Sequence, residues 1–471
     1  MRRHTPFGVA CLSFAVATAC TEPVQPTKAL ASTDTSAHSD LSPSTSSRID
    51  PDALSGGATT VFDAGPGAFG HPAPNLDAAA LARHEAGDAA FSQVFTPSTG
   101  LGPLFNHTAC EACHFGDGRG QPPSDGTSFL SMLFRASVPG QDAHGGPMPA
   151  PIFGGQLQLL AIPGYTPEAS ARVAYVDSGG RYLDGTSYSL RVPRYSFHGI
   201  IAPLPGNLLT SPRVAPVNFG LGLLEAIPQD QILAHADPND ADHDGISGHA
   251  NVVYDQTVLD YVIGRFGWKA NVGTLAHQAA GAFNGDMGIT SSYFPTENCK
   301  GEYPGCADHP PEIDDQTAAD VGFYTQTLGV PARRNVDDPQ VRFGELLFHT
   351  IGCATCHVTT FTTGVLPSVP AVSNQKIHPY TDLLLHNMGA ALADNRPDFR
   401  AGGNEWRTPP LWGIGLVSVV NGHTFFLHDG RARNLTEAVL WHGGEAARTR
   451  ERFKALPEFS RRALIAFLNS L

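Results

Sequence analysis

The sequence predicts a mainly α-helical protein with two similar domains, the first of which carries a long insertion of loops and strands. One observation behind this prediction is a repeated pentapeptide pattern, C-x-x-C-H, which occurs as CEACH at 110–114 and as CATCH at 353–357. A second is that each copy follows a segment with apolar residues at helical spacing, and each half of the chain also ends in such a segment. With 471 residues, 41% of them apolar, the chain is long enough for two domains with cores.

Helices are expected on both sides of each repeat. In the second half, DPQVRFGELLFHTIGC leads into the motif and FSRRALIAFLNSL ends the chain. In the first half, LARHEAGDAAFSQVF comes before the motif and DDQTAADVGFYTQTLGV is the expected closing helix. The proline-containing PARRN at 331–335 marks a boundary, so we expect domains at residues 57–333 and 334–471.

The region between the first motif and its closing helix is expected to be the insertion. It holds about 200 residues rich in glycine and proline, with short alternating runs such as ARVAYV and RYLDGTSYSLRV. Such runs predict a few strands between loops.

The repeated motif predicts two covalently bound haem c groups. Two thiols about one helical turn apart can add to the two vinyl groups of a haem, and the next histidine ligates the iron. A C-x-x-C pair alone also fits a zinc half-site or a redox dithiol, but neither uses the histidine that follows both copies. We therefore expect two c-type cytochrome domains, with haem attached at Cys110, Cys113, Cys353 and Cys356 and iron bound by His114 and His357.

The amino terminus has the features of an export signal. Arg2 and Arg3 precede an apolar run that ends in small residues, which predicts a signal peptide over residues 1–19. Cys20 follows at once, so we expect a periplasmic protein lipidated at this cysteine and tethered to the outer membrane, with ordinary cleavage as the alternative. Residues 20–56 are rich in Ser, Thr, Pro and Ala and are expected to form a flexible tether.

Two further features bear on compartment and partners. Cys299 and Cys306 lie in ENCKGEYPGC and are expected to form a disulfide, which suits an oxidising compartment; two free thiols are the alternative. The formal net charge of −14 argues against nucleic acid as a partner and favours a basic or neutral one.

The axial ligands decide what such haems can do. A haem with both axial positions filled by protein mainly passes electrons, whereas an open position beside polar groups allows reaction with peroxide. The segment FGWKANVGTLAHQAAGAFNGDMGIT resembles a region of bacterial di-haem cytochrome c peroxidases and of the related MauG-type enzymes. The resemblance implies that Trp268 lies between the haems and that Gln278 and Asp286 line the peroxide site. The acid is Asp where those enzymes have Glu, and it comes two residues sooner. A packed core role for Trp268 and a turn-capping role for Asp286 are the alternatives.

A second region bears on the other haem. RTPPLWGIG and FFLHDGRARNLTEAVLWHGGEA resemble the turn and helix that precede the distal ligand of the second haem in the same enzymes. The resemblance implies His442 as the ligand opposite His357, with Met388 as the second choice, while His428 in the turn is expected to bond a propionate or the backbone. Together with PYTDLLLHNMGAALAD, these segments are similar to the di-haem oxidoreductase family, sometimes called thiol oxidoreductase-like.

The segment DPNDADHDGISGHAN predicts either a calcium loop or an acidic turn without metal. Asp240, Asp242 and Asp244 alternate before Gly245, as at the start of an EF-hand loop. The twelfth position is Asn251, where such a loop has a bidentate Glu.

These features predict a periplasmic di-haem enzyme that reduces hydrogen peroxide or uses it to oxidise a partner. Electrons from a redox protein, such as a small cytochrome or a copper protein, would enter at the second haem. One alternative is an electron carrier whose first haem takes His144, His198 or Met148 as its sixth ligand. Another is a MauG-like oxidase that matures a second protein. Thiol oxidation is suggested by the family label alone, because no cysteine outside the motifs looks like a redox dithiol.

Overall fold

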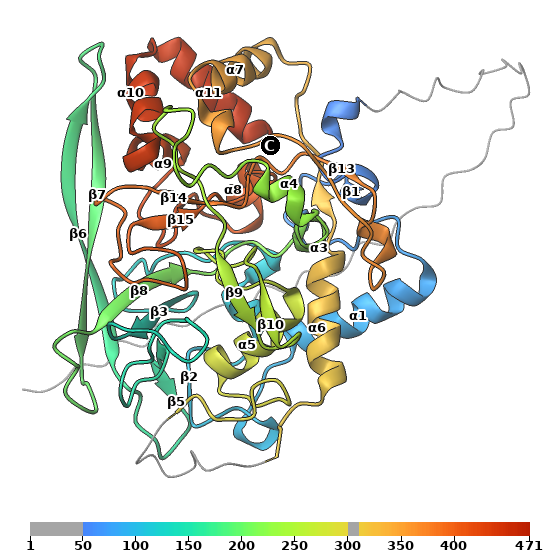
Figure 1. Cartoon of the computed structure of the whole chain (residues 1–471), viewed down its shortest axis with the longest axis vertical. Coiled ribbons are helices and arrows are strands. Elements are labelled where there is room, and N and C mark those ends of the chain that lie inside the picture. Colours follow the sequence, from blue (N-terminus) through green and yellow to red (C-terminus); the bar gives the residue numbers. More distant parts are fainter. Residues whose placement is uncertain (1–49, 300–309) are drawn as a thin grey trace, which may run out of the picture. The chain divides into compact units, whose positions relative to one another are not determined.

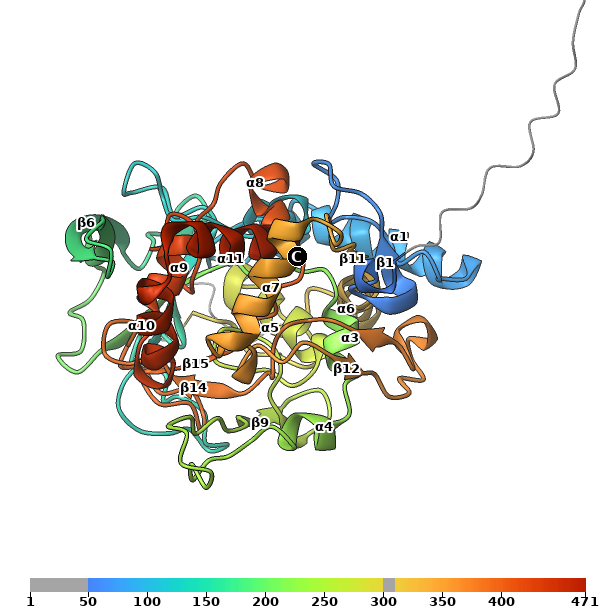
Figure 2. The same ribbon diagram turned by 90° about the horizontal axis from the view of Figure 1, so that it is seen from above.

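Two pairs of helices, one in each half of the chain, frame the two C-x-x-C-H motifs. The computed structural model describes residues 50–299 and 310–471, and Figure 1 shows their arrangement. Helix α1 (Ala78–Ser92) packs on α6 (Asp315–Thr327) in the first half, and α7 (Pro339–Thr350) packs on α11 (Glu458–Ser470) in the second. Figure 2 shows α7 lying across α11. These four helices confirm the segments expected from apolar spacing.

Aspartate caps fix where three of these helices begin. The carboxylates of Asp77, Asp314 and Asp338 each accept a hydrogen bond from a backbone amide in the first turn of α1, α6 and α7. Such caps satisfy amide groups that have no partner inside the helix. Pro339 stands at the first position of α7, where a missing amide hydrogen costs nothing.

A glycine lies at each helix crossing. A Cβ atom on Gly87 of α1 would lie 2.2 Å from the carbonyl oxygen of Asp320, and one on Gly344 of α7 would lie 2.0 Å from that of Ala463. No side chain fits at either point. Four residues after each glycine comes a buried phenylalanine, Phe91 or Phe348, whose ring centroid is 6.2 Å from that of the motif histidine in the same half. The segments GDAAF and GELLF thus form an internal repeat of structure.

The prediction of a mainly α-helical fold is wrong. Helices account for 30% and strands for 19% of the described structure, and the strands form many small sheets, so the fold is mixed. The insertion is the reason, because its alternating segments pair into ladders. Strand β3 (Met132–Ser137) lies between β4 (Gln156–Leu157) and β8 (Leu209–Val214) in an antiparallel sheet. Strands β6 (Ser170–Arg181) and β7 (Ser187–His198) form a long antiparallel hairpin.

The β6–β7 hairpin links the insertion to the second half of the chain. It is the green ribbon at the left of Figure 1. At its base Ala171 packs in a small apolar core with Phe134. Near its tip Asp184 accepts a hydrogen bond of 2.7 Å from Arg461 of α11, and the amide of Leu183 donates to the carbonyl of Lys454.

The remaining elements are short and connect these parts. The other helices are α2 (Cys110–Cys113), α3 (Leu221–Glu225), α4 (Gln229–Leu233), α5 (Leu275–Met287), α8 (Val417–Val420), α9 (Leu435–Trp441) and α10 (Ala447–Ala455). The other strands are β1 (Thr60–Val61), β2 (Leu104–Phe105), β5 (Leu160–Ala161), β9 (Val252–Asp255), β10 (Asp260–Ile263), β11 (Val330–Pro331), β12 (Phe361–Thr362), β13 (Lys376–Ile377), β14 (Leu385–Asn387) and β15 (Glu405–Arg407).

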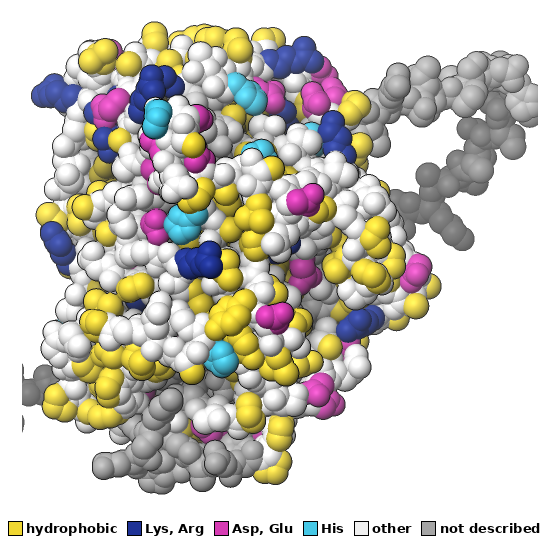
Figure 3. Space-filling model, in the orientation of Figure 1, with side chains coloured by type: hydrophobic (Ala, Val, Ile, Leu, Met, Phe, Trp, Pro, Cys, Tyr) yellow, Lys and Arg dark blue, Asp and Glu magenta, His cyan; other side chains and the backbone are white. Residues whose placement is uncertain are grey.

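One apolar core contains residues from both halves, including Trp268, Phe348 and Phe467, and residues 50–471 belong to one unit. The domain boundary near residue 333 therefore stays a prediction. The predicted signal peptide, Cys20 and most of the predicted tether lie outside the described residues. On the face shown in Figure 3, acidic and basic side chains are interspersed with apolar ones. Among the described helices, none combines the length and apolar character that a membrane span needs.

Candidate haem-binding cavity

Both motifs open onto the same internal cavity. Its volume is about 930 Å³, and its wall includes Cys110, Cys113 and His114 at one end and Cys353, Cys356 and His357 at the other. None of these four cysteines forms a disulfide, so all four are left for haem attachment. Burial raises the pKa of Cys110 and of Cys353 to about 12, so both are neutral thiols at ordinary pH.

The first motif histidine is held with one ring nitrogen free. His114 donates from Nδ1 to the carbonyl oxygen of Pro216 at 2.8 Å, so Nε2 is left for a ligand in the cavity. Burial lowers its pKa, which keeps the ring neutral, the form that binds iron. The Cys113 thiol lies 3.3 Å from the carbonyl oxygen of Leu130, just before β3.

The second motif histidine repeats this arrangement. His357 donates from Nδ1 to the carbonyl oxygen of Tyr380 at 2.9 Å, and burial lowers its pKa to about 4. Two neutral imidazoles with fixed tautomers, each beside two free thiols, fit two haem groups with one histidine ligand each.

His442 belongs to the second end of the cavity. It follows the last residue of α9, and its Nδ1 donates to the carbonyl oxygen of Ala438 at 2.7 Å. Its Nε2 is therefore the nitrogen left for the cavity, and a positive charge on His442 would lower the pKa of His357, so the two imidazoles interact electrostatically. Met388, the second choice, also lies in the cavity wall, next to the end of β14.

The predicted peroxide-site residues share one helix. Gln278 and Asp286 lie two turns apart on α5, and both line the cavity. Asp286 is in the last turn of this helix and not in a loop. Its Oδ1 accepts a hydrogen bond of 2.8 Å from Gln156 of β4. The negative charge of Asp286 raises the pKa of Cys110 and Cys113, so the carboxylate lies at the end of the first motif.

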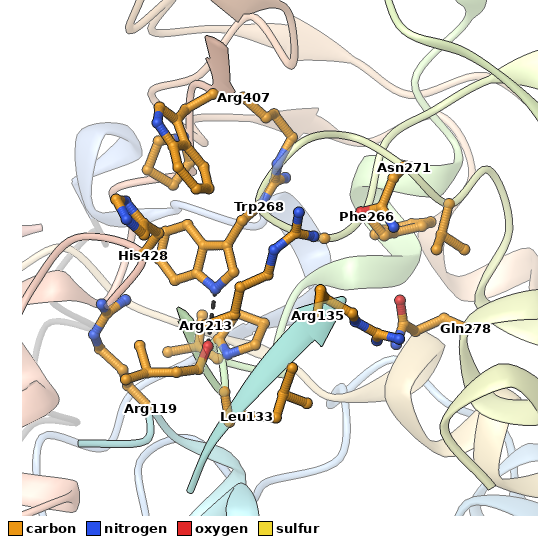
Figure 4. A pocket seen from close by; sticks show the side chains of 18 of the residues that line it. Arg119, Leu133, Arg135, Arg213, Phe266, Trp268, Asn271, Gln278, Arg407 and His428 are labelled. Carbon is orange, nitrogen blue, oxygen red and sulfur yellow. Dashed lines mark hydrogen bonds between the residues drawn. The ribbon is translucent and has the colours of Figure 1, made fainter. Parts of the chain in front are cut away.

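Trp268 also lies in the cavity wall. It is buried, and its indole N–H donates to the carbonyl oxygen of Val214 at 2.8 Å (Figure 4). The guanidinium carbon of Arg119 lies 5.0 Å from the centre of the Trp268 ring. His428 also lines the cavity and stacks on Trp406, with ring centroids 3.8 Å apart. Burial lowers the pKa of His428 to about 3, so this ring is neutral.

The comparison with known families settles the kind of protein. A family described as "Di-haem oxidoreductase, putative peroxidase" has a model that matches residues 50–193 and 206–471. The chain belongs to this family. No curated protein matches the chain. The two haem groups that the family implies are the cofactors that this cavity would hold.

Three other candidate ligands of the di-haem oxidoreductase lie away from its cavity. His144 is exposed and stacks on Tyr254, and His198 is exposed at the end of β7. Met148 is half-buried and is also absent from the cavity wall. The structure therefore brings none of these three to the first haem site.

The di-haem oxidoreductase also has polar cavity residues that the motifs do not reveal. His386 bonds Asp382 at 2.8 Å and Glu445 at 2.7 Å, beside the Cys356 thiol. Burial alone would lower the pKa of His386, but these bonds raise it to about 12. Several arginines also line the cavity, among them Arg119, Arg135, Arg213, Arg396 and Arg407. The only signal for Arg135 in the sequence is its place two residues after Leu133, on one face of a strand.

The three aspartates of the predicted calcium loop do come together. Ligand oxygens of Asp240, Asp242 and Asp244 lie within 4.8 Å of one another. Asn251, at the twelfth position, uses its side chain elsewhere, because it donates to the carbonyl oxygens of Lys269 and Asp398 and is buried. Calcium binding stays a prediction. Cys299 is buried and disulfide-bonded, while Cys306, its predicted partner, lies outside the described residues.

Proposed function

We propose that this di-haem oxidoreductase is an exported c-type enzyme that reduces hydrogen peroxide, or uses it to oxidise a partner. The observation that carries the proposal is the difference between the two ends of the cavity. His357 has a second imidazole, His442, as its neighbour, whereas the wall near His114 carries Gln278 and Asp286. A haem with two histidine ligands suits electron entry, and one beside polar groups suits reaction with peroxide.

The residues have separate tasks. The haems, when bound through the four motif cysteines, supply redox-active iron. Asp286 takes the proton from one peroxide oxygen and returns it to the other as the O–O bond breaks. Its Oδ1 is anchored by Gln156, so Oδ2 is the atom free to exchange the proton. Gln278 orients the oxidant from the same helix. Trp268, which lines the same cavity, passes electrons from one haem to the other.

A pure electron carrier is the less favoured function. It requires a protein ligand on the cavity side of the first haem, and His144, His198 and Met148 lie outside the cavity wall. The described surroundings of Asp286 instead offer carboxylate and amide groups, together with the imidazole of His107, whose Nδ1 already accepts a hydrogen bond from the amide of Thr108.

Export and the donor complete the proposal. The basic and apolar amino terminus with Cys20 supports a periplasmic lipoprotein. A small cytochrome or copper protein would deliver two electrons, entering near His357. Two protons from solvent then convert hydrogen peroxide into two water molecules. The Asp240–Asp244 loop is proposed to hold calcium.

The proposal is tested by mixing the half-reduced protein with hydrogen peroxide in a stopped-flow spectrometer. Haem that remains with the chain after denaturation, at two per chain, checks covalent attachment. The Asp286→Asn variant is expected to react about a hundredfold to a thousandfold more slowly, because it cannot move a proton. Asp286→Glu is the control for Asp286→Asn, because it changes the same residue but keeps a carboxylate. A wild-type protein that is inert to peroxide would contradict the proposal.

A further inference from the structure

Arg135 brings a positive charge into the cavity from the insertion. It lies on β3, two residues after Leu133 and therefore on the same face of the sheet, and both line the cavity. Among residues 50–299 and 310–471, no side chain or backbone carbonyl accepts a hydrogen bond from its guanidinium. Two neighbouring arginines differ, since Arg213 and Arg396 each donate to Asp398 at 3.0 Å.

Arg135 lies at the end of the cavity that holds the first motif. Its Nη1 would be 3.7 Å from a Cβ atom on Gly285, the residue before Asp286. Arg135 and Gln156, which anchors Asp286, are register partners on β3 and β4. Figure 4 shows Arg135 and Gln278 pointing toward each other.

Three polar groups with free bonding capacity therefore face one space. They are the Arg135 guanidinium, the side-chain amide of Gln278 and the Oδ2 atom of Asp286. None of these groups has a hydrogen-bond partner among the described residues. Arg135 is half-buried and faces the cavity, and a guanidinium there is costly to leave without an acceptor once a ligand displaces water. The acceptor must then come from what occupies the cavity.

We propose that Arg135 is a catalytic residue that binds hydrogen peroxide and stabilises the negative charge on the oxygen that leaves. The proposal rests on the proposed function. While Asp286 accepts the proton of one oxygen, the other oxygen gains electron density as the O–O bond breaks, and the guanidinium donates to it. The donor protein supplies two electrons and solvent supplies two protons, so that two water molecules leave. Donors aimed at developing charge act strongly where water is excluded.

The test compares Arg135→Gln and Arg135→Lys with the wild-type holoprotein. Arg172→Gln, on the exposed side of β6, is the control, because it also removes one arginine but leaves the cavity wall intact. Three quantities are measured: the rate constant for peroxide with the half-reduced protein, the affinity of the ferric protein for fluoride by absorbance, and the midpoint potentials of both haems. Arg135→Gln is expected to slow the peroxide reaction about a hundredfold and to weaken fluoride binding, with the potential of the second haem unchanged. Arg135→Lys should recover part of both losses.

Two results would overturn the proposal and leave peroxide reduction standing. One is a wild-type rate in Arg135→Gln. The other is a shifted potential of the first haem with unchanged fluoride affinity, which would make Arg135 a partner of a haem propionate. Failure of the wild-type protein to react with peroxide would instead remove the proposed function, and this role with it. If Arg135→Gln loses its haems, the same measurements on Arg135→Lys, which keeps the charge, test the proposal in its place.

Discussion

Three histidines of the cavity use Nδ1 in the same way. His114, His357 and His442 each donate from Nδ1 to a backbone carbonyl, so each offers Nε2. For the two motif histidines this bond fixes the ring orientation before any metal binds. For His442 the acceptor lies one helical turn back, on α9.

Replacing His442 tests its place as a ligand. His442→Met is expected to raise the midpoint potential of the second haem, because a His/Met pair favours the reduced iron more than a bis-histidine pair does. A potentiometric titration measures the change. Met388→Leu is the matched control and should leave the potential unchanged. A potential that responds to Met388→Leu and not to His442→Met would make Met388 the ligand.

A buried acid outside the cavity gives a test by pH. Glu168 is fully buried, and burial raises its pKa to about 8 although the amide of Gln158 donates to it at 2.7 Å. The folded protein keeps this proton at pH values where the unfolded chain, with a pKa near 4.5, has lost it. The free energy of unfolding should therefore fall as the pH rises from about 4.5 to 8, by about 3 kcal/mol between pH 5 and 7.5.

Glu168→Gln should remove this slope and stabilise the protein at pH 7.5. Denaturant unfolding at several pH values measures how the free energy of unfolding depends on pH. Glu85→Gln, on the exposed side of α1, is the control, because it also removes one carboxylate. A slope that survives in Glu168→Gln would assign the pH dependence to other groups.

The sequence could predict some of these residues and not others. Cys110 and His114 belong to a spaced motif with one chemical meaning, and Gln278 and Asp286 follow from a resemblance. Arg135 and His386 could not be predicted, because their roles depend on which distant strands and loops meet at the cavity. No local spacing records that the guanidinium of Arg135 on β3 comes beside Gly285 of α5.

At the scale of elements, the glycine at each helix crossing can be tested. Gly344→Ala would push α7 away from α11, because the new methyl group would overlap the Ala463 carbonyl oxygen. We expect a loss of about 1–3 kcal/mol in the free energy of unfolding, as for other overpacked sites. Gly206→Ala, where a Cβ atom meets nothing within 4 Å, is the control.

Equal stability of Gly344→Ala and Gly206→Ala would show that the crossing can adjust. The same comparison applies to Gly87 of α1, where the carbonyl oxygen of Asp320 takes the place of Ala463.

The helices could be predicted and the fold class could not. The segments of α1, α6, α7 and α11 have apolar residues at a helical period, and aspartates cap three of them. The insertion misled the prediction because pairing decides whether short alternating runs become a sheet. The β6–β7 hairpin is long because residues 170–181 and 187–198 stay in register throughout.

At the scale of the whole molecule, buried ion pairs join the two halves of the chain. Lys269 donates to Asp394 at 2.8 Å, and Arg213 donates to Asp398 at 3.0 Å. The Arg407 amide also donates to the carbonyl oxygen of Trp268. Leaving one partner of such a pair buried alone costs several kcal/mol, so the halves should unfold together.

Thermal unfolding of the holoprotein should accordingly show one transition. Circular dichroism in the far ultraviolet and haem absorbance should give the same midpoint. Two separate midpoints would show that residues 334–471 are stable without the first half.

We propose that one haem reacts with peroxide while the other keeps two protein ligands. Low-temperature EPR of the oxidised and half-reduced protein, with and without hydrogen peroxide, distinguishes the two haems by their spin states. We expect a low-spin second haem in the oxidised protein. The first haem should be high-spin, or become so on half-reduction, and its signal should change with peroxide. Two low-spin haems in every state, unchanged by peroxide, would instead show that the protein is an electron carrier.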